Sequence, residues 1–129
     1  MVLMRLSIIG LIAPIPPSGG GTVLWPRTHR AVYDVFANLE GKERMDVYHE
    51  KLKEFNQQTP IEACGEAGDI FFWHNLLGHQ AGQNRSKKIQ LRELIMADWD
   101  KAETEEIKSQ RPHADMWHEW STETQAVSI

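Results

Sequence analysis

The chain has 129 residues, a length typical of a single domain that can bury a hydrophobic core. Hydrophobic residues make up 41% of the chain and charged residues 25%, and these ordinary values argue against disorder. The formal net charge of −4 gives no electrostatic reason to expect a nucleic-acid partner. The single cysteine, Cys64, excludes an internal disulfide and fits a reducing compartment. We expect Cys64 to be a small buried side chain.

The N-terminal residues predict two strands joined by a turn. Residues 3–13 are rich in Leu and Ile and indicate a strand that is buried on both faces. Residues 1–17 also resemble a secretory signal, but the apolar run is too short to span a bilayer and its prolines suit cleavage poorly. We therefore favour the strand, and a cytoplasmic location is the default expectation. Residues 14–21, PIPPSGGG, predict a turn, and residues 22–25, TVLW, predict a second short strand.

Two helices are predicted to interrupt the strands. The first carries four apolar side chains at helical spacing, Val32, Val35, Phe36 and Leu39. It is expected to end at Gly41. The second is expected over residues 42–57 as an amphipathic helix with one buried stripe: Met45, Tyr48, Leu52 and Phe55. Pro60 then marks the return to strands.

Further strands are predicted over residues 60–99. In chain order we expect an edge strand over 60–64, a turn over 66–69, an apolar strand over 70–74, a turn with a short strand over 75–82, a polar loop over 84–88 and the longest strand over 89–99. Strands at both ends with helices between them indicate a mainly β barrel or sandwich with helical insertions.

Residues 100–129 are expected to form a helical tail of the same domain. Asp100 and Glu103 make a capping pattern for a charged helix that reaches about Gln110. Trp117 and Trp120 lie three residues apart and indicate a last helical turn.

Two stretches of the chain carry a specific combination of motifs. Residues 20–30 read GGTVLWPRTHR, which is a glycine turn, a strand and a PRTHR corner. Residues 68–84 read GDIFFWHNLLGHQAGQN, and Ser86 and Arg92 follow them. In this order and at this spacing, the two stretches resemble the phytanoyl-CoA dioxygenase family, and the likeness covers about residues 3–99.

The resemblance implies a partial double-stranded β-helix, the cupin-like jelly roll. Residues 1–99 would be the C-terminal part of the barrel, with the helical insertion at about 28–57. The family's early strand, which carries a His-x-Asp motif, has no counterpart before residue 3, so the chain is expected to be truncated at its N-terminus. A truncated barrel exposes a sheet edge, and a second subunit or a missing N-terminal segment is the expected partner that covers it.

The resemblance also implies Fe(II) and 2-oxoglutarate as cofactors. Family members hold the metal with two histidines and a carboxylate, and the second histidine matches His79. The arginine that clamps the far carboxylate of 2-oxoglutarate matches Arg92, because a guanidinium fork fits a planar carboxylate. The family usually places this arginine two residues closer to the histidine, where this chain has Gln90. Strand periodicity keeps Gln90 and Arg92 on one face, so the choice between them stays open.

The other histidines have alternative interpretations. His74 could add a second imidazole, but we expect it to pack beside Phe72 or to flank the site. His113 and Asp115 have the His-x-Asp form, although they follow the barrel instead of preceding it. His29 is expected in the PRTHR corner and His49 on the solvated side of a helix. His118 is expected beside the tail tryptophans.

Three functions follow from these observations. When complete, the protein is expected to be an oxidoreductase, a dioxygenase that uses Fe(II) and 2-oxoglutarate to hydroxylate a small organic substrate. Because no His-x-Asp motif precedes the first strand of the chain, the alternative is a catalytically inactive barrel that lacks these metal ligands and acts as a binding or assembly module. A third reading is a metal-independent anion binder that uses Arg92 without His79. No nucleic-acid or membrane partner is expected, and no residue pattern identifies the substrate.

Overall fold

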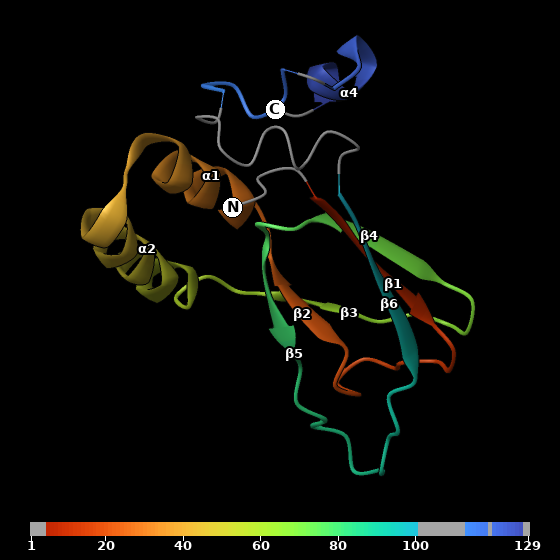
Figure 1. Cartoon of the computed structure of the whole chain (residues 1–129). Helices are drawn as coiled ribbons and strands as arrows, with labels where there is room; N and C mark the ends of the chain where they lie inside the picture. Colours follow the sequence, from red (N-terminus) through yellow and green to blue (C-terminus); the bar gives the residue numbers. More distant parts are fainter. Residues whose placement is uncertain (1–4, 101–112, 119, 128–129) are drawn as a thin grey trace.

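The computed structural model describes residues 5–100, 113–118 and 120–127, and these form two antiparallel sheets with helices at one end (Figure 1). The first sheet has the order β4-β1-β6, with bounds Ile70–His74, Arg5–Leu11 and Leu94–Asp100. The second sheet has the order β3-β2-β5, with bounds Ile61–Ala63, Thr22–Trp25 and Gly78–Ala81. The helices are α1 at Thr28–Asn38, α2 at Gly41–Phe55 and α4 at Thr122–Val127.

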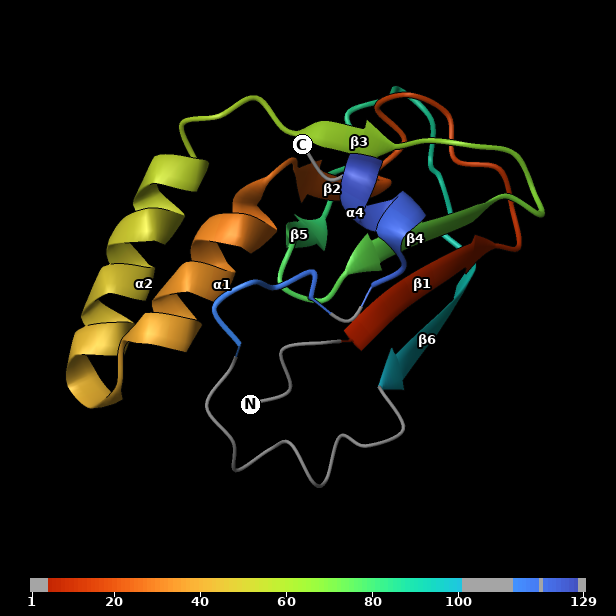
Figure 2. The ribbon, with the colours of Figure 1, turned by 90° about the horizontal axis from the view of Figure 1, so that it is seen from above.

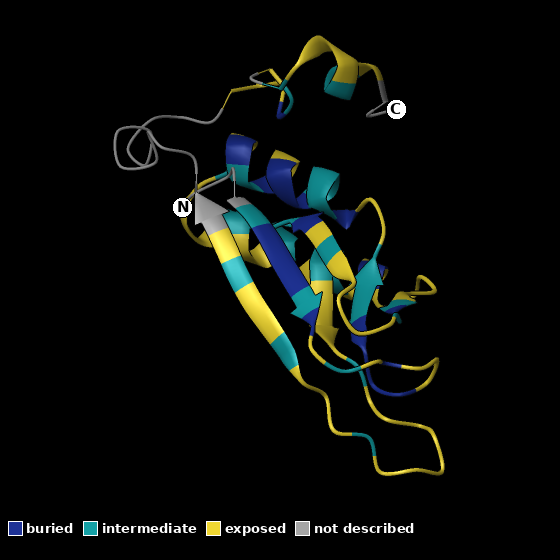
Figure 3. Cartoon of the chain, turned by 90° about the vertical axis from the view of Figure 1, so that its right-hand side faces the viewer, coloured by how far each residue is buried: buried dark blue, intermediate teal, exposed yellow. Residues whose placement is uncertain are grey.

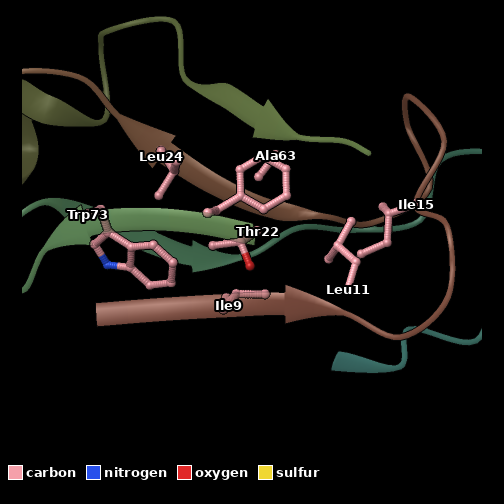
Figure 4. A pocket seen from close by; sticks show the side chains of 8 residues that line it. Ile9, Leu11, Ile15, Thr22, Leu24, Ala63 and Trp73 are labelled. Atoms are coloured by element: carbon pink, nitrogen blue, oxygen red, sulfur yellow. The ribbon is translucent and has the colours of Figure 1, made fainter. Parts of the chain in front are cut away.

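The core lies between the two sheets. Ile9 and Leu11 on β1 and Trp73 on β4 are buried, and Leu24 on β2 packs against them from the opposite sheet. Figure 4 shows these side chains pointing toward one another around a small cavity. Each such aliphatic or aromatic side chain contributes about 1.5–3 kcal/mol when it is fully buried. Apolar residues stand at consecutive positions in β1 and β4, so the sequence predicts apolar strands, and the strand register decides which of their residues face inward.

The inner face is not closed along β6. The antiparallel register pairs Met96 with Ile9, and paired residues point to the same side of a sheet. Ile9 is 4% exposed, whereas Met96 is 65% exposed. β5 and β6 are edge strands, and the exposed Met96 shows that the inner face is open along β6 within the described residues. Figure 3 shows the exposed β6 beside the buried β1.

The outer face of the β4-β1-β6 sheet is apolar and uncovered within the described residues. Gly10 lies between its register partners Ile70 and Ile95, which are 57% and 64% exposed. No atom lies within 4 Å of the place where a Cβ on Gly10 would sit, so this point of the face is hollow.

The two long helices lie side by side at one end of the sandwich, as Figure 2 shows from above. Helix α1 buries Thr28, Val32 and Val35 on one side and Tyr33 and Ala37 on another, while α2 buries only Phe55 among its residues. The C-terminal segment packs on α1, where Met116 is buried against Tyr33 and Ala37. The Tyr33 hydroxyl donates a hydrogen bond to the His113 carbonyl at 2.8 Å.

The prediction of a mainly β chain with helical insertions is confirmed, and the strands form two small antiparallel sheets. The strand predicted over residues 89–99 is wrong at its start, because β6 begins at Leu94. Leu94 pairs with Leu11, the last residue of β1, so residues 89–93 have no partner strand there. Gly41 was expected to end the first helix, but it begins α2, and Leu39 caps α1 in an extended conformation. Of the helix expected from Asp100 to Gln110, Asp100 is the last residue of β6, and residues 101–110 lie outside the described residues.

No helix in the part of the chain that the structure describes is both long and apolar enough to cross a bilayer. Residues 5–11, which lie within the signal-peptide alternative at 1–17, form β1 in the middle of its sheet.

Candidate functional site

His79 lies on β5 and faces the space between the sheets. Its register partner on β2 is Leu24, which lines the cavity between the sheets, so both side chains point inward. The imidazole packs against the buried Trp73, with 5.5 Å between the ring centroids. Because β5 is an edge strand, the side chain is still exposed. His79 is therefore on the inner face and within reach of solvent from the open side.

The hydrogen bond that His79 makes defines its tautomer. Its Nδ1 lies 2.8 Å from the Leu77 carbonyl oxygen, and a carbonyl can only accept. Nδ1 therefore carries the hydrogen in the neutral ring, and the lone pair is on Nε2. This is the arrangement of a metal-binding histidine, whose second nitrogen donates to a carbonyl or carboxylate.

Arg92 does not lie on a strand. It stands two residues before β6, it is exposed, and its Nη1 donates to the Gly20 carbonyl at 3.1 Å. Gly20 precedes Leu24, the partner of His79, by four residues along the same segment. Arg92 is thus fixed to the glycine turn at the start of β2, and His79 lies farther along the same pair of strands.

Gln90 is held at a different place. Its Nε2 donates to the Pro14 carbonyl at 3.0 Å, in the turn between β1 and β2. Gln90 and Arg92 therefore bond to two different carbonyls, at Pro14 and at Gly20, and only the second lies next to the strand that pairs with β5.

The glycine turn that anchors Arg92 is tied to the loop after β5. Gly82 N–H donates to the Gly21 carbonyl at 2.9 Å, and Arg85 N–H donates to the Ser18 carbonyl at 2.9 Å. Gly20 has a φ of +90°, and a Cβ there would lie 3.0 Å from the Asn84 amide nitrogen. Both the conformation and the close approach require glycine at this position.

Sequence reasoning missed Glu62, whose carboxylate holds this turn. Its oxygens accept hydrogen bonds from the backbone N–H groups of Ser18, Gly20 and Gly21 at 2.7, 2.9 and 2.8 Å. Partial burial raises the pKa of the Glu62 carboxyl, but the three N–H groups and the Cys64 thiol lower it by more, so the net pKa is below its usual value. A run of glycines is a known anion-binding signal, yet nothing in the sequence spacing points to a glutamate on β3.

Cys64 lies beside this carboxylate and is half-buried, not fully buried as expected. Burial raises the pKa of the Cys64 thiol, and the charge of Glu62 adds to the rise. The thiol is therefore protonated near neutral pH and is a poor nucleophile.

The remaining candidate ligands do not gather around His79. His74 lies 5.7 Å from His29 between ring centroids, and Trp117 packs edge-on against both rings. His113 stacks on His118 in the C-terminal segment, at 3.9 Å. Among the described residues, no three His, Cys, Asp or Glu side chains are grouped so that they could hold a metal ion. A facial triad needs three protein ligands, so these residues do not fit a complete iron site.

The imidazole of His29 lies in an environment that lowers its pKa. Burial lowers the pKa of its imidazole, and the neighbouring Arg30 charge lowers it further. Its Nδ1 is buried without a hydrogen-bond partner in the described part of the chain. The ring is therefore neutral at physiological pH and packs as an apolar group under Trp117.

Comparison with known proteins agrees with the motifs. A sequence model of the family described as Phytanoyl-CoA dioxygenase (PhyH) matches residues 8–92, which is more than half of the chain. No curated protein and no solved structure matches the chain significantly. The matched region includes both stretches of motif residues, His79 and Arg92. The chain therefore belongs to the phytanoyl-CoA dioxygenase family.

Proposed function

We propose that the complete protein is a dioxygenase that depends on Fe(II) and 2-oxoglutarate and hydroxylates a small organic substrate. In this proposal His79 supplies one of the metal ligands and Arg92 binds the far carboxylate of 2-oxoglutarate. The observation that carries it is the position of His79, whose Nε2 lone pair is available on the inner face of the sandwich. The oxidative chemistry would come from the cofactors, while the protein binds and orients them.

The role of Arg92 is supported by its anchoring. One guanidinium nitrogen donates to the Gly20 carbonyl, and a guanidinium has further N–H donors that a carboxylate could accept. Gln90 stays the alternative at this position, but a neutral carboxamide offers neither the charge nor the fork of an arginine.

For the fold, we infer a partial jelly roll that other strands complete. The edges of β5 and β6 are free within the described residues, and both faces of β6 carry exposed apolar side chains, Ile95 and Met96. Free strand edges with apolar faces are templates for pairing with another segment. We propose that a second subunit or a further N-terminal segment covers these edges and brings the two ligands that the described residues lack.

The test is succinate release by a form of the protein that is extended upstream, assayed with Fe(II), ascorbate and 2-oxoglutarate. His79→Ala should abolish the release, and Arg92→Ala should raise the KM for 2-oxoglutarate by about tenfold or more, as expected for a charge-assisted hydrogen bond. His49→Ala, an exposed change on α2, is the control and should leave both values unchanged. An upstream reading frame without a His-x-Asp motif, or full activity in His79→Ala, would refute the proposal.

The alternative function is a catalytically inactive binding or assembly module. It is favoured by the placement of candidate ligands, since no three His, Cys, Asp or Glu side chains among the described residues are grouped so that they could hold a metal ion. Anaerobic calorimetry of the chain with Fe(II) and 2-oxoglutarate separates the two functions. If the heat of binding disappears in His79→Ala, the inactive-module function is contradicted. If only Arg92→Ala reduces the heat of binding, the protein is a metal-independent anion binder.

A further inference from the structure

Thr28 is among the most deeply buried side chains of the structure, at 2% exposure, and its hydroxyl joins two segments. It donates a hydrogen bond to the Trp25 carbonyl at 2.8 Å, at the end of β2. It also accepts one from the Gly78 N–H at 2.7 Å, at the start of β5. The hydroxyl thus fixes the first residue of β5 to the corner between β2 and α1.

The turn before β5 is held by further backbone bonds. Leu77 N–H donates to the His74 carbonyl at 2.9 Å, and Leu76 N–H donates to His74 Nδ1 at 3.1 Å. These bonds and the Thr28 hydroxyl bind three successive N–H groups, those of Leu76, Leu77 and Gly78. The carbonyl of Leu77, which accepts from His79, belongs to this same turn.

We propose that Thr28 is a positioning residue for His79. By holding Gly78, its hydroxyl fixes the direction of the Leu77 carbonyl, and this carbonyl keeps the imidazole in the tautomer that leaves Nε2 open. The inference rests on the proposed role of His79 as a metal ligand, but the tautomer can be measured without a metal.

The surroundings favour this role over a general packing role. The Thr28 side chain is 2% exposed, and hydrogen bonds shielded from water are stronger. A Cβ on Gly78 would lie 3.0 Å from the Thr28 hydroxyl oxygen, so the two residues fit closely. Valine would fill the space of Thr28 but could neither donate to Trp25 nor accept from Gly78.

The experiment compares Thr28→Val with Thr28→Ser by ¹⁵N NMR of the histidine rings at about pH 8, where imidazoles are neutral. Thr28→Val should lower the ratio of the Nδ1–H tautomer of His79 to its Nε2–H tautomer about fivefold. A change of this size corresponds to the net free energy of one hydrogen bond. It should also speed hydrogen exchange at Gly78. Thr28→Ser keeps the hydroxyl and should restore both readouts.

Thr22→Val is the matched control, because Thr22 is a buried threonine on β2 that makes no hydrogen bond to this turn. If Thr28→Val fails to fold, Gly78→Ala tests the same contact, since its methyl group would displace the hydroxyl without removing it. An unchanged His79 tautomer in a folded Thr28→Val or Gly78→Ala variant would overturn the inference.

Failure of the proposed function gives a different pattern. In the upstream-extended protein, Thr28→Val should weaken Fe(II) binding about tenfold, the usual size of an effect on an outer partner of a ligand. If that protein binds no iron while the tautomer still responds to Thr28→Val, the positioning role stands and the dioxygenase proposal fails. If that protein binds iron and the His79 tautomer does not respond to Thr28→Val, the dioxygenase proposal stands and the positioning role of Thr28 fails.

Discussion

Two polar side chains near the motif residues are held by backbone groups. Three N–H groups bind the Glu62 carboxylate, and the Leu77 carbonyl binds the His79 ring. The motif predicted His79 as a candidate ligand, but its tautomer depends on a carbonyl two residues away, whose direction a linear sequence does not specify. Glu62 could not be predicted at all, because its partners lie more than forty residues earlier in the chain.

Glu62→Gln should destabilise the fold by about 1 kcal/mol at pH 7, since one carboxylate acceptor of backbone N–H groups is lost and Glu62 is partly exposed. Because the pKa of the Glu62 carboxyl is lowered in the folded state, its stabilisation is present above the unfolded value and is lost as the pH falls through the folded value. Urea denaturation should therefore show that the gap between the two proteins narrows as the pH falls below the ordinary glutamate pKa of about 4.3. Glu66→Gln, an exposed change in the next turn, is the control, and a gap that persists in acid would contradict the expectation.

His29 should make stability fall on mild acidification. Its pKa is lowered by burial and by Arg30, so below about pH 6.5 the unfolded chain binds a proton that the folded chain does not. Stability should decrease as the pH falls below that value and level off below the folded pKa. In His29→Gln the slope between pH 7 and 5 should be shallower, measured by denaturation at each pH. His49→Gln, on the exposed side of α2, should keep the wild-type slope, and equal slopes in all three proteins would refute this assignment.

At the scale of elements, the sequence predicted where strands occur better than where they end. The apolar run Ile70–His74 and the short TVLW strand have the expected bounds, because prolines, glycines and the turn at Glu66–Asp69 delimit them. Residues 89–93 have an equally strand-like composition but no partner, since β1 ends opposite Leu94. Strand length is decided by the partner, and a single sequence does not show the partner's end.

The C-terminal segment should contribute to stability through Met116. This side chain is 7% exposed and packs against Tyr33 and Ala37 of α1, although the sequence offered no periodicity that predicts the contact. Met116→Ala should cost about 2–5 kcal/mol, the usual range for a large-to-small change in a core. Thermal denaturation and proteolysis of the segment would measure it. Met45→Ala, on α2 with 41% exposure, is the matched control and should cost far less.

At the scale of the whole molecule, the apolar surface is distributed unevenly. The inner face near β1 and β4 is buried, whereas Ile70 and Phe72 of β4 and Ile95 of β6 are more than half exposed on the outer face. Together with the free edge of β6, this face is the part of the described molecule best suited to contact another chain. The sequence signalled such a face only indirectly, through strands with apolar residues at consecutive positions.

The chain alone should therefore self-associate as its concentration rises, and Ile95→Lys should weaken the association. The lysine would place a charge beside the hollow at Gly10 on an edge strand, where pairing with a second chain would have to desolvate it. We expect the apparent dissociation constant from sedimentation velocity to rise about tenfold, equivalent to about 1.4 kcal/mol. Met45→Lys adds the same charge on α2 and controls for net charge. A wild-type chain that stays monomeric up to high micromolar concentration would show that this face needs no second copy, and it would leave an additional N-terminal segment as the proposed cover.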